Sequence, residues 1–262
     1  LANASYVKNE IKNLGNQTGY IDKESLPTLG TVSRNQNGYP IGYFFGYKAI
    51  GVFQTQEEID NYISPATGKP IQPNAVPGDT KFEDLNGDGV ISDDNEDRTM
   101  IGKPNPDWMV GLTVAADWNG FDLSAFFQGS FGADVFDALR RYELAAVNYT
   151  SDALERWTGP GTSNSMPRIV LGDTPKNFRP STLLVHDASF LRLRNLQVGY
   201  TLPAQLTRKA YIQRLRFYAS FDNLLTITGY KGMDPEIGST MGIDKGVYPQ
   251  ARVYTFGLNL TF

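Results

Sequence analysis

One stretch of the chain has the residue types and the spacing of a calcium-binding loop. It runs Asp84-Leu85-Asn86-Gly87-Asp88-Gly89-Val90-Ile91-Ser92. In such a loop, one Ca²⁺ ion is held by side-chain oxygens at the first, third and fifth positions and by the backbone carbonyl at the seventh, with a glycine at the sixth. The sequence therefore predicts a structural calcium site whose first ligands are Asp84, Asn86, Asp88 and the carbonyl of Val90.

The closing ligand of this loop departs from the pattern. The twelfth position, where a bidentate glutamate is usual, is Asn95. The acidic residues that could replace it are Asp93, Asp94, Glu96 and Asp97, and we assign Asp93 and Asp97. This departure argues against an EF-hand helix pair, and the alternative is an Asp/Gly-rich turn held by its own side-chain hydrogen bonds. In either case the stretch would stiffen a long loop without any implication of catalysis.

The remaining reactive residue types exclude several kinds of site. His186 is the only histidine, so the chain cannot form a histidine-based triad or a multi-histidine metal site, and we expect His186 to be a loop residue. The absence of cysteine rules out disulfides and thiolate metal sites. Carboxylate pairs such as Asp93 and Asp94 lie in the predicted calcium loop, and nothing marks them as an acid/base pair. The chain is predicted not to be an enzyme.

A glycine- and aromatic-rich run, Gly42 to Gly51, could contact a ligand in another way. It lacks the Lys-Ser/Thr ending of a phosphate-binding loop. Its aromatic side chains could stack on sugar rings, but packing of the loop on itself is the favoured interpretation; they are Tyr43, Phe44, Phe45 and Tyr47. A net charge of -4 without a dense basic block argues against a nucleic-acid partner.

The elements that must position these residues are strands. In Ala251 to Phe262, large apolar residues occupy every second position and mostly small or polar residues fill the other register. A membrane barrel strand has this pattern because it turns its apolar side chains to lipid. The terminal Phe262, after Thr255, Gly257 and Leu260, also resembles the C-terminal signal of bacterial outer-membrane proteins. An amphipathic strand of a soluble sandwich is the alternative.

Five further segments read as strands. The clearest two flank Asn119-Gly120, the dipeptide typical of a two-residue hairpin turn. The six predicted strands lie near residues 1–14, 108–118, 121–131, 189–202, 214–225 and 251–262. The long connections between them are 15–107, 132–188 and 226–250, and we expect helix near 54–62 and within 134–157.

Short and long connections alternate along these strands, which is the asymmetry of an outer-membrane barrel. Strands of about 11 residues tilted near 45° rise about 25 Å, which matches the apolar band of such barrels. All three long loops would face outside. Arg214, Arg216 and Asp222 would face the barrel interior, where they could line a permeation path or pair with a plug. Six strands cannot close in lipid, so at least two more must come from elsewhere.

Bulk composition agrees with short strands and turns. The 262 residues are 12% aromatic and include 26 glycines and 15 prolines, with a mean hydropathy of -0.34. No run approaches the 18 or so consecutive apolar residues that a membrane helix needs. The sequence has no initiator methionine or signal peptide and starts within a predicted strand, so we expect it to be the C-terminal piece of a longer protein.

Several motifs together resemble the C-terminal region of SusC/RagA-type TonB-dependent outer-membrane transporters of Bacteroidetes. In chain order they are Gly38 to Tyr47, Gly51 to Gln54, Pro77 to Asp79, Asp84 to Gly89, Arg98 to Pro106, Arg156-Trp157, Phe190 to Asn195, Gly199 to Pro203 and Phe221 to Leu224. Between Gly89 and Arg98 this chain is slightly longer than the usual pattern, at the position of the last calcium ligand.

The resemblance implies an all-β transmembrane barrel of 22 strands, of which this chain would be the last six. It implies an N-terminal plug and a TonB-contacting segment elsewhere in the protein, and a location in the bacterial outer membrane. It also implies a SusD-like surface lipoprotein that covers the outer loops, and TonB-driven import of oligosaccharides or, in some members, peptides. No short motif identifies the substrate.

Two other function classes share some of these features. A passive porin or structural barrel would have the same strands and would differ by lacking the plug. A soluble, calcium-stabilised β module of a secreted adhesin or carbohydrate-active enzyme would stay soluble without detergent, and the asymmetry of the connections argues against it.

Overall fold

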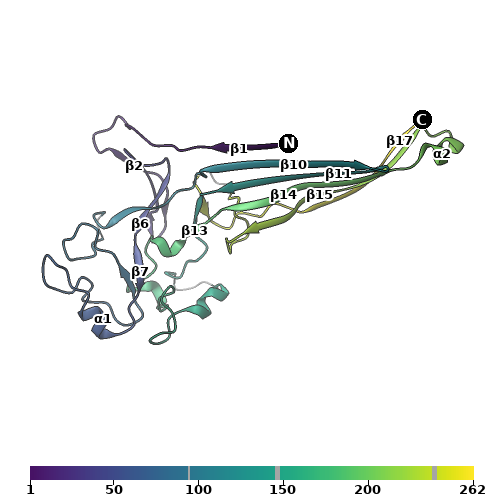
Figure 1. Cartoon of the computed structure of the whole chain (residues 1–262). Helices are drawn as coiled ribbons and strands as arrows, with labels where there is room; N and C mark the ends of the chain where they lie inside the picture. The colour runs from purple at the N-terminus through teal and green to yellow at the C-terminus, as the bar shows by residue number, and fades with distance from the viewer. Residues whose placement is uncertain (94, 145–147, 238–240) are drawn as a thin grey trace.

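The computed structural model describes residues 1–93, 95–144, 148–237 and 241–262. The chain forms a long antiparallel sheet and, at one end of it, a module made from the long connections (Figure 1). The sheet has the order β1-β10-β11-β14-β15-β17. Its strands are β1 (Ala2–Tyr6), β10 (Trp108–Trp118), β11 (Phe121–Phe131), β14 (Phe190–Thr201), β15 (Arg214–Thr228) and β17 (Val253–Thr261).

One face of this sheet is apolar and open to its surroundings. The register places Ala116, Leu123, Val198, Ala219 and Phe256 beside one another across five strands. Large exposed side chains continue this face along the strands, among them Trp108, Leu112, Val114, Trp118, Phe121, Phe217, Leu225, Ile227, Tyr254, Leu258 and Leu260. A monomeric soluble protein rarely exposes an apolar face of this extent, so the face requires an apolar environment.

A β-bulge in β14 changes which residues of the strand point to the apolar face. Arg194 is an extra residue, because Asn195 pairs with Phe126 of β11 whereas Leu193 pairs with the next residue, Phe127. Leu196 and Leu193 therefore both lie on the apolar face although three positions separate them. The bulge also places both Arg192 and Asn195 on the polar face. A prediction that assumes strict alternation of side chains along the strand cannot reveal it.

Two expected elements differ from the structure. β1 ends at Tyr6 because the following residues bind the module: the amide of Ile11 donates to the carbonyl of Tyr39 (2.9 Å). The expected helix within 134–157 is wrong at its start, where β12 (Asp134–Asp137) pairs with β13 (Val185–Asp187). Pairing between distant segments overrides local helix propensity there. The described remainder of that range contains only a short 3₁₀ helix, η1 (Ser151–Glu155).

The described part of the module contains four small sheets and little helix. β2 (Tyr20–Asp22), β5 (Ser33–Gln36), β6 (Tyr43–Tyr47) and β9 (Arg98–Gly102) form one sheet, and β12, β13 and β16 (Ile243–Asp244) form another. The strand pairs β3 (Ser25–Leu26) with β4 (Gly30–Thr31), and β7 (Ala49–Val52) with β8 (Thr80–Phe82), complete it. The described helices of the module are α1 (Gln56–Asp60), η1, η2 (Leu171–Asp173) and η3 (Thr182–Leu184). Two more, α2 (Ala204–Thr207) and η4 (Arg208–Ala210), lie in the short connection between β14 and β15, at the other end of the sheet (Figure 1).

One of the apolar clusters of the module draws its residues from all three long connections. Val32 and Phe44 come from the first, Phe136 and Leu184 from the second, and Ile243 from the third, and all five are at most 2% exposed. The connections therefore fold together as one body. Among the described residues, no helix has both the length and the apolar content needed to cross a bilayer.

Gly199 on the polar face of β14 makes room for an ion pair between its neighbours. The Arg216 guanidinium donates to the Asp122 carboxylate through Nε (2.8 Å) and Nη2 (2.5 Å). A Cβ at Gly199 would lie 2.4 Å from both Arg216 Nη2 and Asp122 Oδ2, well inside van der Waals contact.

We predict that Gly199→Ala lowers the free energy of unfolding of the sheet by about 1 kcal/mol, because the ends of the Arg216 and Asp122 side chains must move apart and weaken their hydrogen bonds. The measurement is the thermal unfolding midpoint of the intact protein in detergent. Gly159→Ala is the matched control, since a Cβ there meets no atom within 4 Å. Equal midpoints for the two variants would contradict the prediction.

Candidate functional site

The predicted calcium loop folds into a tight turn that its own side chains hold. The two carboxylate oxygens of Asp84 accept the amides of Gly87 and Gly89, both at 2.8 Å. Asn86 Oδ1 accepts the amide of Asp88 (2.9 Å), and Asp88 Oδ1 accepts the amide of Val90 (2.8 Å). These bonds turn the side-chain oxygens and the backbone of the loop toward one another, as both an Asx-stabilised turn and a calcium loop require.

Of the candidate closing ligands, Asp97 returns to the loop. Its carboxylate, buried completely, accepts the amides of Leu85 (3.1 Å) and Ser92 (2.9 Å). Glu96 also reaches the loop, where it accepts Asn86 Nδ2 (3.0 Å). Asp93 is instead ion-paired with Lys176, and the hydrogen bond from that ammonium holds the pKa of Asp93 below its usual range. Asp94 lies outside the described residues.

The donor set of this loop fits a hard cation. In the described part of the chain, no three His, Cys, Asp or Glu side chains gather as a metal site. A loop of this kind, however, also draws ligands from asparagine and a backbone carbonyl. Each oxygen of Asp84 accepts one amide and keeps a lone pair for an ion.

The aromatic run in β6 packs inside the module. Tyr43, Phe44, Phe45 and Tyr47 are at most 4% exposed. Phe45 lies between two guanidinium groups, those of Arg34 (3.6 Å from the ring centroid) and Arg98 (4.3 Å). The favoured interpretation, packing of this loop on itself, is confirmed, because none of these rings is exposed at the surface of the module.

His186 lies in the short strand β13 rather than in an irregular loop. Its Nε2 is 3.7 Å from the carboxylate of Asp137, and burial lowers the pKa of the imidazole. A neutral histidine is therefore the form at pH 7, and its place within a strand pair is a structural one.

The charged residues predicted for the polar face take different partners. Arg216 pairs with Asp122, and Asp222 accepts Asn195 Nδ2 (2.7 Å). Arg214 is exposed at the start of β15. The two paired groups are thus satisfied within the sheet.

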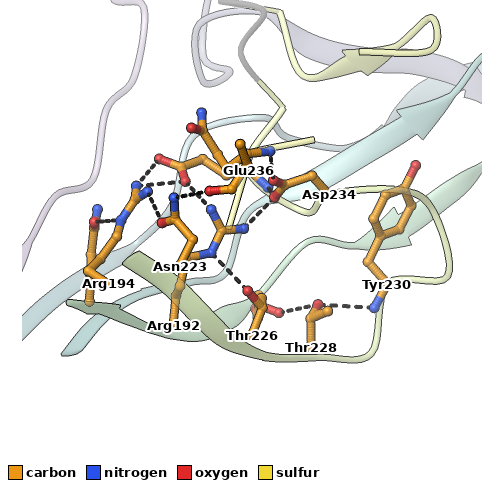
Figure 2. A network of polar contacts seen from close by, with 12 residues as sticks. Arg192, Arg194, Asn223, Thr226, Thr228, Tyr230, Asp234 and Glu236 are labelled. Carbon is orange, nitrogen blue, oxygen red and sulfur yellow. Dashed lines mark hydrogen bonds and ion pairs between the residues drawn. The ribbon is translucent and has the colours of Figure 1, made fainter. Parts of the chain in front are cut away.

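A larger polar network on the same face was not predicted from the sequence. Figure 2 shows Arg192 of β14, only 2% exposed, directed at two acidic residues of the third connection. Its guanidinium donates to Asp234 (2.5 Å) and Glu236 (2.9 Å), and its Nε to Thr226 (2.9 Å). Arg194, the bulge residue, also donates to Glu236 (2.6 Å).

This network fastens the third connection to the sheet. Asp234 accepts the backbone amides of Glu236 and Gln250, each at 2.9 Å, besides its bond with Arg192. Burial alone would raise the pKa of Asp234, but these hydrogen bonds and the guanidinium outweigh it and lower the pKa. The sequence signal was a pair of arginines two apart in a strand whose other face is apolar, but their acidic partners lie about 40 residues away in a connection without periodicity.

Comparison with known proteins identifies relatives over almost the whole chain. TonB-dependent receptor P3 of Formosa agariphila is 34% identical over 238 residues, which cover 87% of this chain and 23% of the relative. TonB-dependent receptor SusC of Bacteroides thetaiotaomicron is 30% identical over 263 residues, covering 99% of this chain and 24% of SusC. The chain is a relative of the SusC/RagA-type TonB-dependent receptors. No family model matches it.

The solved structure of the RagAB peptide transporter shares the fold. It matches the whole chain with a TM-score of 0.73 and 27% identity, over 27% of that chain. The predicted fold class, an all-β transmembrane barrel of the SusC/RagA type, is thereby confirmed, whereas the total of 22 strands and the place of these six within it stay predictions. The chain spans about a quarter of the length of these relatives.

We predict that Arg192→Met releases the third connection from the sheet. The variant leaves the carboxylate of Asp234, which is only 7% exposed, without its cationic partner. Breaking such a buried ion pair should lower the free energy of unfolding by about 3 kcal/mol, the low end of the usual range, because two backbone amides still bind the carboxylate. Amide hydrogen exchange of residues 229–237 and 241–252 in the intact receptor should accelerate about a hundredfold. Arg214→Met, which removes an exposed arginine of the neighbouring strand, is the control.

The ion pair between Arg192 and Asp234 should also weaken as the pH falls. The pKa of Asp234 is lower in the folded state than in the unfolded state, so its contribution is present above the unfolded value of about 3.9 and is lost as the pH falls through the folded value. Protection factors, which are corrected for the intrinsic pH dependence of exchange, are the quantity to compare. Protection that is equal in the two variants, or that does not fall with acid in the unmodified protein, would contradict the role of the network.

Proposed function

We propose that the chain supplies wall strands and outer loops of a TonB-dependent importer in the bacterial outer membrane. The match of nearly the whole chain to TonB-dependent receptors, SusC among them, carries this proposal. The exposed apolar face of the sheet supports it, because such a face is stable against lipid. Transport, not catalysis, is the proposed activity.

The rest of the importer would come from sequence outside this chain. β1 and β17 are the edges of the described sheet, and an unpaired edge is unfavourable in lipid. We propose that further strands complete a 22-stranded barrel and that an N-terminal plug fills it and contacts TonB. A SusD-like lipoprotein is the proposed partner over the outer loops, and the name of the RagAB complex is compatible with such a pair.

The proposed cargo is an oligosaccharide, with a peptide as the alternative. The resemblance to SusC-type receptors led to the first expectation. The RagAB peptide transporter, which matches the whole chain with a TM-score of 0.73, supports the second. A passive porin would share the strands but would need no TonB. A soluble β module is disfavoured by the exposed apolar face and by the relatives.

Uptake by living cells distinguishes import of oligosaccharides, import of peptides and passive diffusion through a porin. We predict that deleting the gene for the intact receptor reduces growth on one class of oligosaccharide and leaves growth on peptides unchanged, and that deleting TonB has the same effect. Loss of growth only on peptides would favour the alternative cargo. Uptake that continues without TonB would refute active import in favour of a porin.

We propose further that Asp84, Asn86, Asp88, the carbonyl of Val90 and Asp97 hold a structural Ca²⁺ ion. The curled loop and the buried carboxylate of Asp97 support this set. Asp93, which the sequence also suggested, is the weakest member because Lys176 binds its carboxylate. The ion would stiffen the connection that leads from β8 into β9.

We predict that Ca²⁺ stabilises the intact receptor after treatment with a chelator. At a concentration a hundred times its Kd, the ion should add about 2.7 kcal/mol to the free energy of unfolding of the module. Calorimetric titration should detect one site that Asp84→Asn removes and that the control Asp93→Asn retains. An equal response from Asp84→Asn and the unmodified protein would disprove the assignment, and no response in any of them would leave the Asx-stabilised turn as the explanation.

A further inference from the structure

A small polar cavity lies within the module where the first two long connections meet. Its volume is about 330 Å³, within the range of ligand-binding pockets. Tyr47 and Arg98 come from the first connection, and Glu143, Asp173 and Arg179 from the second. No role has yet been given to this cavity, which adjoins the predicted calcium loop through Asp93 and is lined by no residue of the network around Arg192.

Three buried polar atoms of its lining have no hydrogen-bond partner among the described residues. They are Arg98 Nε, Glu143 Oε2 and Arg179 Nη1, the last of which forms an ion pair with Asp93 Oδ1 at 3.9 Å, too far for a hydrogen bond. The Glu143 side chain is only 7% exposed, and its other oxygen already binds Arg141. Native proteins satisfy nearly all such groups, because leaving one unpaired costs about 1–3 kcal/mol. Three of them around one cavity indicate that a bound molecule completes them.

The positions of these groups are fixed by the core. Arg98 lies against the rings of Phe45 (4.3 Å) and Tyr47 (5.7 Å), and its Nη2 donates to the carbonyl of Phe45 (2.7 Å). Arg179 lies over Tyr47 (4.8 Å) and Phe82 (4.9 Å). The cavity is therefore preorganised, so a ligand would lose little affinity to side-chain ordering.

The charges of the lining cancel. Three cationic residues face three acidic ones, namely Arg98, Lys176 and Arg179 against Asp93, Glu143 and Asp173. Burial raises the pKa of Asp173 to about 6, which still leaves its carboxylate mostly ionised at pH 7. An ion would thus gain little net attraction, so the balance favours a neutral ligand.

The unpaired atoms require a ligand that both accepts and donates hydrogen bonds. Two guanidinium N–H groups need acceptors, and one carboxylate oxygen needs a donor. A hydroxyl group supplies both, and adjacent hydroxyls on a ring can reach several groups at once. A zwitterion would have to lose the hydration of two charges for the same few contacts, which is unfavourable.

We propose that this cavity binds a neutral, hydroxyl-bearing ligand: a sugar residue that contacts Arg98, Glu143 and Arg179. The identity of the sugar as part of the imported cargo rests on the proposed import function, but the binding site itself does not. Water has the same donor and acceptor chemistry and is the occupant that an experiment must separate from sugar.

The test is an equilibrium titration of the intact receptor, purified in detergent without TonB, with glucose, galactose, mannose and the dipeptide alanyl-alanine as probes. At least one hexose should bind saturably. Glu143→Gln and Arg179→Lys should each weaken that binding about tenfold or more, the loss expected when a hydrogen bond to a charged group is removed. The control, Lys69→Gln, changes the larger neighbouring cavity of about 690 Å³ and should leave the affinity unchanged.

The thermal unfolding midpoint of each variant shows whether it is folded, and a structure of the receptor with the bound hexose checks the contacts. Binding that neither cavity variant weakens, preferential binding of the dipeptide, or ordered water as the only occupant would overturn the proposal. Since the titration needs no TonB, a failure of uptake with intact hexose binding would count against import alone, and uptake without such binding would count against this site.

Discussion

The period of two in the strands of the long sheet is the constraint on which the structure depends. It turns one complete face apolar, and that face buries nothing within the described chain. Every ionisable side chain in the middle of the sheet must then lie on the other face, where neighbouring strands are its nearest partners. The ion pair between Asp122 and Arg216 is an example. Gly199 lies between these two side chains, and its lack of a Cβ leaves them room to meet.

The bulge at Arg194 creates the site where the third connection binds the sheet. By adding one residue, it keeps Leu191 and Leu193 on the apolar face and brings two arginines to the polar one. Buried arginines would be costly alone, but Asp234 and Glu236 approach from the third connection, and two backbone amides complete the hydrogen bonds of Asp234. The network therefore fixes a geometry as much as it adds stability, since its groups are satisfied only when the connection lies against β14 and β15.

Sequence reasoning could predict the sheet because its signal is local. The hairpin of β10 and β11 occupies the residues that alternation and Asn119-Gly120 indicated. The bulge, the short length of β1 and the strand β12 could not be predicted, because each depends on a partner far away in the chain. For the same reason the spacing around Asp84 could suggest a calcium loop, whereas the contacts of Asp97 with Leu85 and Ser92, and of Asp93 with Lys176, could not be predicted because these residues meet only in space.

The shared core of the module limits how its connections can move. Because Phe44, Phe136 and Ile243 come from three different connections, opening one of them alone would expose the core side chains of the other two. The proposed ion site and sugar site are neighbours in this body, since Asp97 and Arg98 are adjacent residues. Arg98 also binds the carbonyl of Phe45, next to Phe44 of the core. A shift of either residue would therefore displace the other, and any coupling between the two proposed sites must act equally in both directions.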